Sequence, residues 1–161
     1  MEEYTNNFCT YSEDETIKTG EFLAELLNGD EIILLSGDLG AGKTRFVKGL
    51  ARGLGISQEI TSPTFIIVNE YYGEQNLFHF DLYRLTREEE LVEIGFEEYL
   101  YREGVVVIEW PELALPFLPH EYIYLNLKVE EANKRCIEIQ ASDDHYKKIA
   151  ERLKKNANFR S

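Results

Sequence analysis

Positive charge is scarce in this 161-residue sequence, which carries 17 lysines and arginines against 30 aspartates and glutamates. The resulting net charge is −13 at pH 7. An acidic surface repels polyphosphate, so we do not expect the chain by itself to bind nucleic acid well. The charge serves either solubility or docking to a basic partner, and the sequence leaves both explanations open.

Cysteine and long apolar runs are scarce as well. The two cysteines, Cys9 and Cys136, lack the spacing of metal ligands, and we predict that both are reduced packing residues. No apolar run approaches the length of a membrane span, and the acidic residues at the start are unlike a signal peptide. We therefore expect a cytoplasmic protein, and the length favours a single domain over residues 1–161.

Glycine is concentrated in one stretch. Residues 37–44, GDLGAGKT, fill every fixed position of the phosphate-binding loop pattern G-x-x-x-x-G-K-[ST]. An apolar strand is expected before this loop, at residues 31–36, and a helix after it, at residues 43–54. The loop backbone and the helix start would capture an anion, Lys43 would reach the β- and γ-phosphates, and the Thr44 hydroxyl would take a Mg²⁺ site.

Two carboxylates stand at the ends of expected strands. Glu109 follows residues 105–108, which are β-branched and apolar throughout, as in a strand buried on both faces. It is therefore the better candidate for Mg²⁺, through a bound water. Asp81 is expected across the site, as a second metal partner or to orient the attacking water. The plainer alternatives are a solvated strand end for Glu109 and an ion pair with Arg84 for Asp81.

Other polar and aromatic residues have two interpretations each. Ser62 and Thr64 flank a proline and either sense the γ-phosphate or simply lead into a strand predicted at residues 65–71. Trp110 stacks on a base, forms part of a docking surface or packs in the core. His79 is interpreted as a structural hydrogen-bonding residue.

The remaining pattern predicts helices and short strands in alternation. The strand at 65–71 pairs with one at 76–82 in a hairpin, and alternating segments at 122–129 and 135–141 predict an antiparallel section. Residues 4–11 suit an edge strand. Helices are expected at 12–27, within 86–102 and from about residue 142.

Four motifs in order carry a family resemblance: residues 37–44, then SPTF at 62–65, HFDLYR at 79–84 and EWP at 109–111. Together they resemble the TsaE (YjeE) family, the small bacterial ATPases of tRNA N6-threonylcarbamoyladenosine biosynthesis. The chain has no N-K-x-D guanine reader, since its only Asn-Lys pair, at 133–134, lacks the aspartate. ATP is therefore the expected nucleotide.

The resemblance implies an α/β fold, a P-loop NTPase-like three-layer sandwich with a mixed, largely parallel central sheet plus antiparallel strands. It implies slow, Mg²⁺-dependent ATP hydrolysis that supports turnover of the TsaB–TsaD transferase, which modifies adenosine 37 of tRNA. Lys43, Asp81 and Glu109 would be catalytic, and Thr44, Asp81 and Glu109 would face the metal. The expected nucleotide contacts are Asp38, Leu39, Gly40, Ala41, Gly42, Lys43, Thr44, Arg45, Ser62, Thr64 and Trp110, with Glu13, Lys134 and Arg135 suggested near the adenine.

Two other functions compete with this one. A small-molecule kinase on the same fold would use an arginine-bearing lid, for which Arg84, Arg87 and Arg102 are the candidates, although they form no compact segment. A nucleotide-gated binding module would dock to its partner according to whether ATP is bound, without needing its cleavage.

Overall fold

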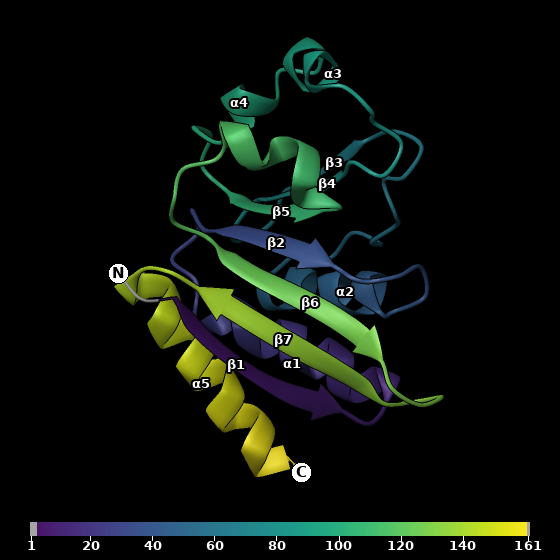
Figure 1. The fold of residues 1–161 in the computed structure, drawn as a ribbon, viewed down its shortest axis with the longest axis vertical. Coiled ribbons are helices and arrows are strands. Elements are labelled where there is room, and N and C mark those ends of the chain that lie inside the picture. Colours follow the sequence, from purple (N-terminus) through teal and green to yellow (C-terminus); the bar gives the residue numbers. More distant parts are fainter. Residues whose placement is uncertain (1–2, 161) are drawn as a thin grey trace.

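A seven-stranded mixed sheet with the order β1-β7-β6-β2-β5-β4-β3 forms the centre of the protein (Figure 1). The structure, a computed structural model, describes residues 3–160, and the side chains as far as residue 157. The strands are β1 (Tyr4–Thr10), β2 (Ile32–Ser36), β3 (Val68–Tyr71), β4 (Leu77–Asp81), β5 (Val105–Glu109), β6 (Ile123–Val129) and β7 (Arg135–Ala141). The helices are α1 (Glu13–Glu25), α2 (Lys43–Gly53), α3 (Glu88–Glu93), α4 (Phe96–Tyr99), α5 (Asp144–Arg160) and the 3₁₀ helix η1 (Pro111–Phe117).

The middle of the sheet is parallel and its margins are antiparallel. The parallel middle consists of four adjacent strands, β6, β2, β5 and β4. β3 pairs antiparallel with β4, and β7 pairs antiparallel with both β6 and β1. All five residues of β2 and of β5 are buried, as expected for strands covered on both faces. The predicted mixed sheet, the 122–129 and 135–141 strands and the N-terminal edge strand are confirmed.

Successive residues of the central strands point into two separate cores, which makes the fold three-layered. Ile33 and Leu35 pack with the buried faces of α1, α2 and α5. Ile32 and Leu34 pack on the other side with α3, α4 and η1. Figure 1 shows α1 and α2 behind the sheet and α5 running along β1. No helix within residues 3–160 is long and apolar enough to cross a membrane.

The strand predicted at residues 65–71 is shorter than expected. β3 begins only at Val68, because Pro63 opens a turn in which its carbonyl accepts hydrogen bonds from the N–H groups of Ile66 and Ile67. Ile67 consequently has a φ of +74°, a left-handed conformation that is uncommon for a β-branched residue. Phe65 and Ile66 are left exposed beside the site described below.

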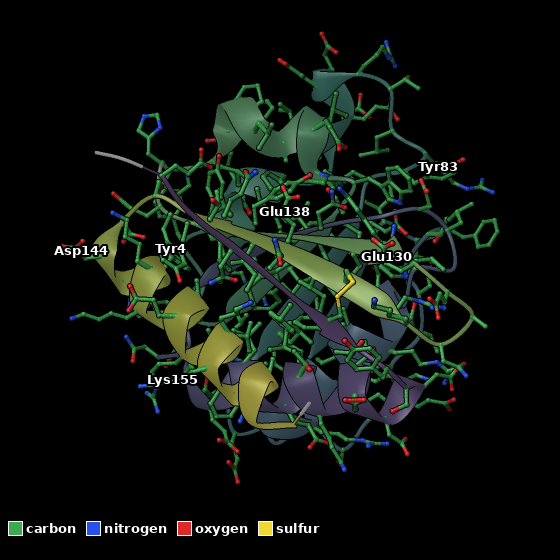
Figure 2. The ribbon with its side chains drawn as sticks, turned by 60° about the horizontal axis from the view of Figure 1, so that its bottom comes forward. Tyr4, Tyr83, Glu130, Glu138, Asp144 and Lys155 are labelled. Atoms are coloured by element: carbon green, nitrogen blue, oxygen red, sulfur yellow. A yellow bond between two sulfur atoms is a disulfide. The ribbon has the colours of Figure 1, made fainter. Side chains whose placement is uncertain are left out.

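The prediction of reduced cysteines is wrong. Cys9 and Cys136 are directly opposite each other in the β1–β7 pairing and form a disulfide, the yellow bond in Figure 2. Spacing of 127 residues along the chain gave no indication of this contact. Only the register of two antiparallel strands brings the two side chains to the same face and the same height.

Glu31 closes the end of the sheet opposite the glycine-rich loop. Its buried carboxylate accepts hydrogen bonds from the backbone N–H groups of Asn28, Gly29 and Asp30, at 2.7, 2.9 and 3.1 Å. His145 Nε2 lies 2.8 Å from the same carboxylate. Burial raises the pKa of Glu31, but the hydrogen bonds together outweigh burial and hold the pKa below its usual value.

We therefore expect Glu31→Gln to lower the free energy of unfolding by about 1–3 kcal/mol at neutral pH. Because the folded-state pKa is depressed, this stability is present above the unfolded pKa of about 4.3 and is lost as pH falls through the folded value. Urea unfolding at several pH values measures the effect, with the exposed Glu121→Gln as control. Equal stability losses for both variants at pH 7 would contradict this role.

Candidate nucleotide-binding site

The glycine-rich loop joins the central strand β2 to α2 and leaves the start of that helix open. Gly37, Gly40 and Gly42 have φ values of +141°, +83° and +99°. A Cβ at Gly37 would lie 2.5 Å from the carbonyl oxygen of Leu127, so the backbones approach too closely for any other residue. No side chain of the described residues caps α2, whose first N–H groups are therefore available to an anion.

A cavity of about 300 Å³ lies over this loop. It gathers six parts of the chain: the loop itself, the turn before β3, the end of β4, the end of β5, the start of α1 and the β6–β7 turn. The lining residues are Ser12, Glu13, Thr16, Leu39, Gly40, Gly42, Lys43, Thr44, Arg45, Ser62, Thr64, Asp81, Glu109, Trp110, Ala132, Asn133 and Arg135.

This cavity is lined by most of the residues that the sequence predicts for the site, but three of them lie outside it. Ala41 is buried in the core beneath the loop. Asp38 is exposed and faces a neighbouring cavity on the other side of Trp110. The Lys134 ammonium lies over the ring of Tyr11. Glu13 lies at the rim, where its carboxylate pairs with Arg45 at 3.3 Å.

The sequence reasoning missed four lining residues: Ser12, Thr16, Ala132 and Asn133. Ser12 was recognisable only as the cap of α1, a role that it fills by accepting a hydrogen bond from Glu15 N. The β6–β7 turn reaches the loop because Arg135 extends toward Gly40, with its Nη2 3.5 Å from the Gly40 carbonyl. No local pattern predicts this contact, which depends on the order of the strands.

The two carboxylates lie side by side and not across the site. Asp81 and Glu109 are paired residues at the ends of the neighbouring parallel strands β4 and β5. Asp81 accepts hydrogen bonds from the Thr64 hydroxyl (2.8 Å) and from Tyr83 N (2.9 Å). The Ser62 hydroxyl lies 2.7 Å from that of Thr64 and extends this chain of contacts. Arg84 lies over the Phe65 ring, so the expected alternative of an Asp81–Arg84 pair is not seen.

Lys43 is the buried cation of the site. Its ammonium donates a hydrogen bond to the Gly37 carbonyl (2.6 Å), lies 4.0 Å from Glu109 Oε1 and stands 4.2 Å from the centre of the Trp110 ring. Burial lowers the pKa of Lys43, although the Glu109 and Asp81 carboxylates oppose the shift. A phosphate arriving beside this ammonium would replace the water that burial has removed.

Trp110 lines the cavity beside Lys43 and is not a core residue. It has a left-handed backbone, with φ +55° and ψ +61°. Its ring is half-buried between Lys43 and the ring of Tyr83, whose centroid is 4.9 Å away. Because the indole contacts Lys43, an anion that binds to this lysine would change the surroundings of the ring.

The oxygen atoms in the cavity suit a magnesium ion. The Thr44 hydroxyl and the Asp81 and Glu109 carboxylates all line it, and oxygen is the ligand that Mg²⁺ prefers. Within the described residues, no three His, Cys, Asp or Glu side chains gather as a metal-binding group.

A parallel-centred sheet between two helical layers, with a glycine-rich loop leading from β2 into α2, defines the chain as a P-loop NTPase-like α/β protein. The family model described as threonylcarbamoyl adenosine biosynthesis protein TsaE matches residues 10–137. The chain belongs to the TsaE family.

Individual relatives match most of the chain. A tRNA threonylcarbamoyladenosine biosynthesis protein TsaE of Treponema pallidum is 43% identical over 128 residues, 80% of this chain and 95% of that protein. The protein of the same name from Bacillus subtilis is 37% identical over 151 residues, 93% of this chain and 94% of its own. The crystal structure of Bacillus subtilis YdiB superposes with a TM-score of 0.81 at 31% identity, covering 97% of this chain and 98% of that one.

Two glycine substitutions test the geometry of the loop. Gly37→Ala would push against the Leu127 carbonyl, so we expect ADP affinity to fall about tenfold or more. Gly40→Ala meets no atom within 4 Å and has only the cost of its left-handed φ, about 1–2 kcal/mol. Titration with a fluorescent ADP analogue compares the two. Equal losses of affinity would show that the close approach at Gly37 is unimportant.

Proposed function

We propose that this chain binds Mg·ATP and hydrolyses it slowly, in support of tRNA threonylcarbamoyladenosine formation by a TsaB–TsaD transferase. The observation that carries the proposal is one cavity that joins the phosphate-binding loop to Asp81 and Glu109. The names of the family and of its relatives supply the biosynthetic context.

The residues divide the chemistry between binding and positioning. The backbone N–H groups of the loop and of the start of α2 hold the phosphates, with Lys43 at the β- and γ-positions. A bound Mg²⁺ would neutralise phosphate charge, held by the Thr44 hydroxyl and, through water, by Glu109. Asp81 orients the attacking water, and its contact with Thr64 carries the state of the γ-phosphate to the 62–64 turn.

The opposite wall suits the nucleoside. Ser12, Asn133 and Arg135 line the cavity and offer hydroxyl, amide and guanidinium groups. In the sheet, the β6–β7 pair lies on the other side of β2 from the strands that carry the carboxylates. Arg135 is held in place by the carbonyls of residues 131, 132 and 134, to which its Nη1 donates. With no N-K-x-D motif to read guanine, adenine is the base that we assign to this wall.

An apolar rim at the mouth of the cavity supports docking of a partner protein. Leu39, Phe65, Ile66 and Tyr83 are 72, 78, 61 and 51% exposed. Leu39 lines the cavity, Phe65 and Ile66 follow Thr64 in the chain, and Tyr83 packs on Trp110. A partner seated there would cover the phosphate end of the site, and the acidic chain would leave contact with tRNA to that partner.

The structure offers nothing specific in favour of a small-molecule kinase. Of the three arginines considered for a lid, Arg84 lies over Phe65 at the rim, Arg87 lies beside Glu90, and Arg102 pairs with Glu70 at 3.0 Å. None of them lines the cavity over the loop.

Lys43→Ala tests the proposal at its first step. Loss of a charged hydrogen-bonding group should weaken ATP binding about tenfold to a hundredfold and abolish measurable hydrolysis. Arg52→Ala is the matched control, because Arg52 is an exposed cation near the other end of α2. Affinity and hydrolysis unchanged in Lys43→Ala would overturn the phosphate-loop interpretation.

Reconstitution tests the biological role. The chain is mixed with ATP, Mg²⁺, its cognate TsaB–TsaD pair, tRNA and threonylcarbamoyl-adenylate, and modified tRNAs are counted per transferase. We expect repeated turnover with the wild-type chain and none beyond the background with Lys43→Ala. Wild-type protein that hydrolyses ATP but gives no gain in turnover would refute the role in tRNA modification while leaving the ATPase intact.

A further inference from the structure

We propose that His79 is a positioning residue for Glu109, one that binds one carboxylate oxygen and thereby aims the other at Lys43 and the phosphate end of the cavity. This inference rests on the proposed function, because it assigns how the metal-facing carboxylate is held. The sequence alone suggests only that His79 is a structural hydrogen-bonding residue, and this inference goes beyond that role.

The register of the sheet places His79 directly beneath the site. β4 and β5 run parallel, with His79 paired to Val107 and Asp81 paired to Glu109. His79 and Asp81 are two positions apart in β4, so both side chains leave the same face of the strand. His79 is fully buried and does not line the cavity, whereas Asp81 and Glu109 do. It therefore acts from below the floor of the site and touches no nucleotide.

The two oxygens of Glu109 have different neighbours. Oε2 lies 2.5 Å from His79 Nε2, and Oε1 lies 4.0 Å from Lys43 Nζ. Glu109 is itself almost fully buried, so water cannot replace a lost partner of Oε2 easily. A carboxylate fixed at one oxygen keeps its other oxygen in one direction, which is what an outer ligand of a hydrated Mg²⁺ requires.

A role in packing alone does not explain an imidazole at this position. His79 Nδ1 is buried and has no hydrogen-bond partner in the described part of the chain. The side chain thus gains its polar contact through Nε2 and Glu109, with the proton on Nε2 donated to the carboxylate. An apolar residue would fill the same space, on the face of the sheet that carries Leu77 and Val107, without desolvating an imidazole. The contact with Glu109 is the one feature that an apolar residue could not supply.

Loss of the contact should affect the Mg²⁺-dependent step and spare phosphate binding. The loop backbone and Lys43 bind the phosphates without His79. Glu109 released from His79 would sample several side-chain rotations, and only some direct Oε1 toward the metal. We expect the Mg²⁺-dependent gain in ADP affinity and the rate of ATP hydrolysis each to fall about tenfold or more.

Two amides of similar polarity separate positioning from folding. In His79→Gln the amide nitrogen reaches the place of Nε2 and keeps the contact with Glu109. In His79→Asn it reaches only the place of Nδ1, so the contact is lost. ADP affinity is measured by calorimetry in EDTA and in Mg²⁺, ATP turnover is measured against Mg²⁺ concentration, and thermal unfolding shows whether the variants fold equally well. Phe80→Leu, a change in the core on the same strand, controls for packing.

We expect His79→Asn to bind ADP within twofold of wild type in EDTA and to lose most of the Mg²⁺-dependent gain in ADP affinity. We expect His79→Gln to recover most of that gain. The inference is overturned if His79→Asn behaves like Phe80→Leu, if its affinity falls equally with and without Mg²⁺, or if Gln restores nothing. A crystal structure of His79→Asn gives a readout independent of activity, with Glu109 rotated from Lys43 as the expected result. An unmoved Glu109 would also overturn the inference, whereas a wild-type chain without ATPase activity would refute only the proposed function.

Discussion

The parallel register of β2, β5 and β4 is the constraint on which the site depends. These three strands end at the same edge of the sheet, and backbone hydrogen bonds tie their ends together. Trp110 N donates to the carbonyl of Leu35, and Leu82 N donates to that of Glu109. β2 continues into the glycine-rich loop, β5 delivers Glu109 and β4 delivers Asp81. A phosphate-binding surface and two carboxylates therefore meet without any of them having to fold independently.

The same edge also underlies the proposed signal from the site to a partner. Asp81 contacts Thr64, which is followed by the exposed Phe65 and Ile66. Lys43 contacts Trp110, which packs on the exposed Tyr83. Each residue that would move with the phosphate thus has an apolar neighbour at the surface. The proposed signal from a bound nucleotide would pass through only two or three residues.

Local sequence pattern predicted the parts of the site that depend on local structure. The loop at 37–44 and the buried strand before Glu109 are continuous segments, so their structure could be predicted from neighbouring residues. Ser12, Asn133 and the Cys9–Cys136 disulfide could not, because each depends on where β1 and β7 lie in the sheet. The prediction of a strand at 65–71 was wrong for residues 65–67, for a different reason. These residues are apolar, which suggested a strand, but the turn at Pro63 determines their conformation. Phe65 and Ile66 are exposed at the rim.

The central claim is that Glu109 acts on Mg·ATP from the end of β5, and Glu109→Gln tests it most directly. Glutamine has the same shape and can still contact His79, but it has no charge to direct toward a hydrated Mg²⁺. The measurement is the rate of ATP hydrolysis at saturating Mg²⁺ and ATP. The account predicts a rate about a hundredfold or more below wild type, with ADP affinity in EDTA retained. A Glu109→Gln protein that hydrolyses ATP at the wild-type rate would contradict it.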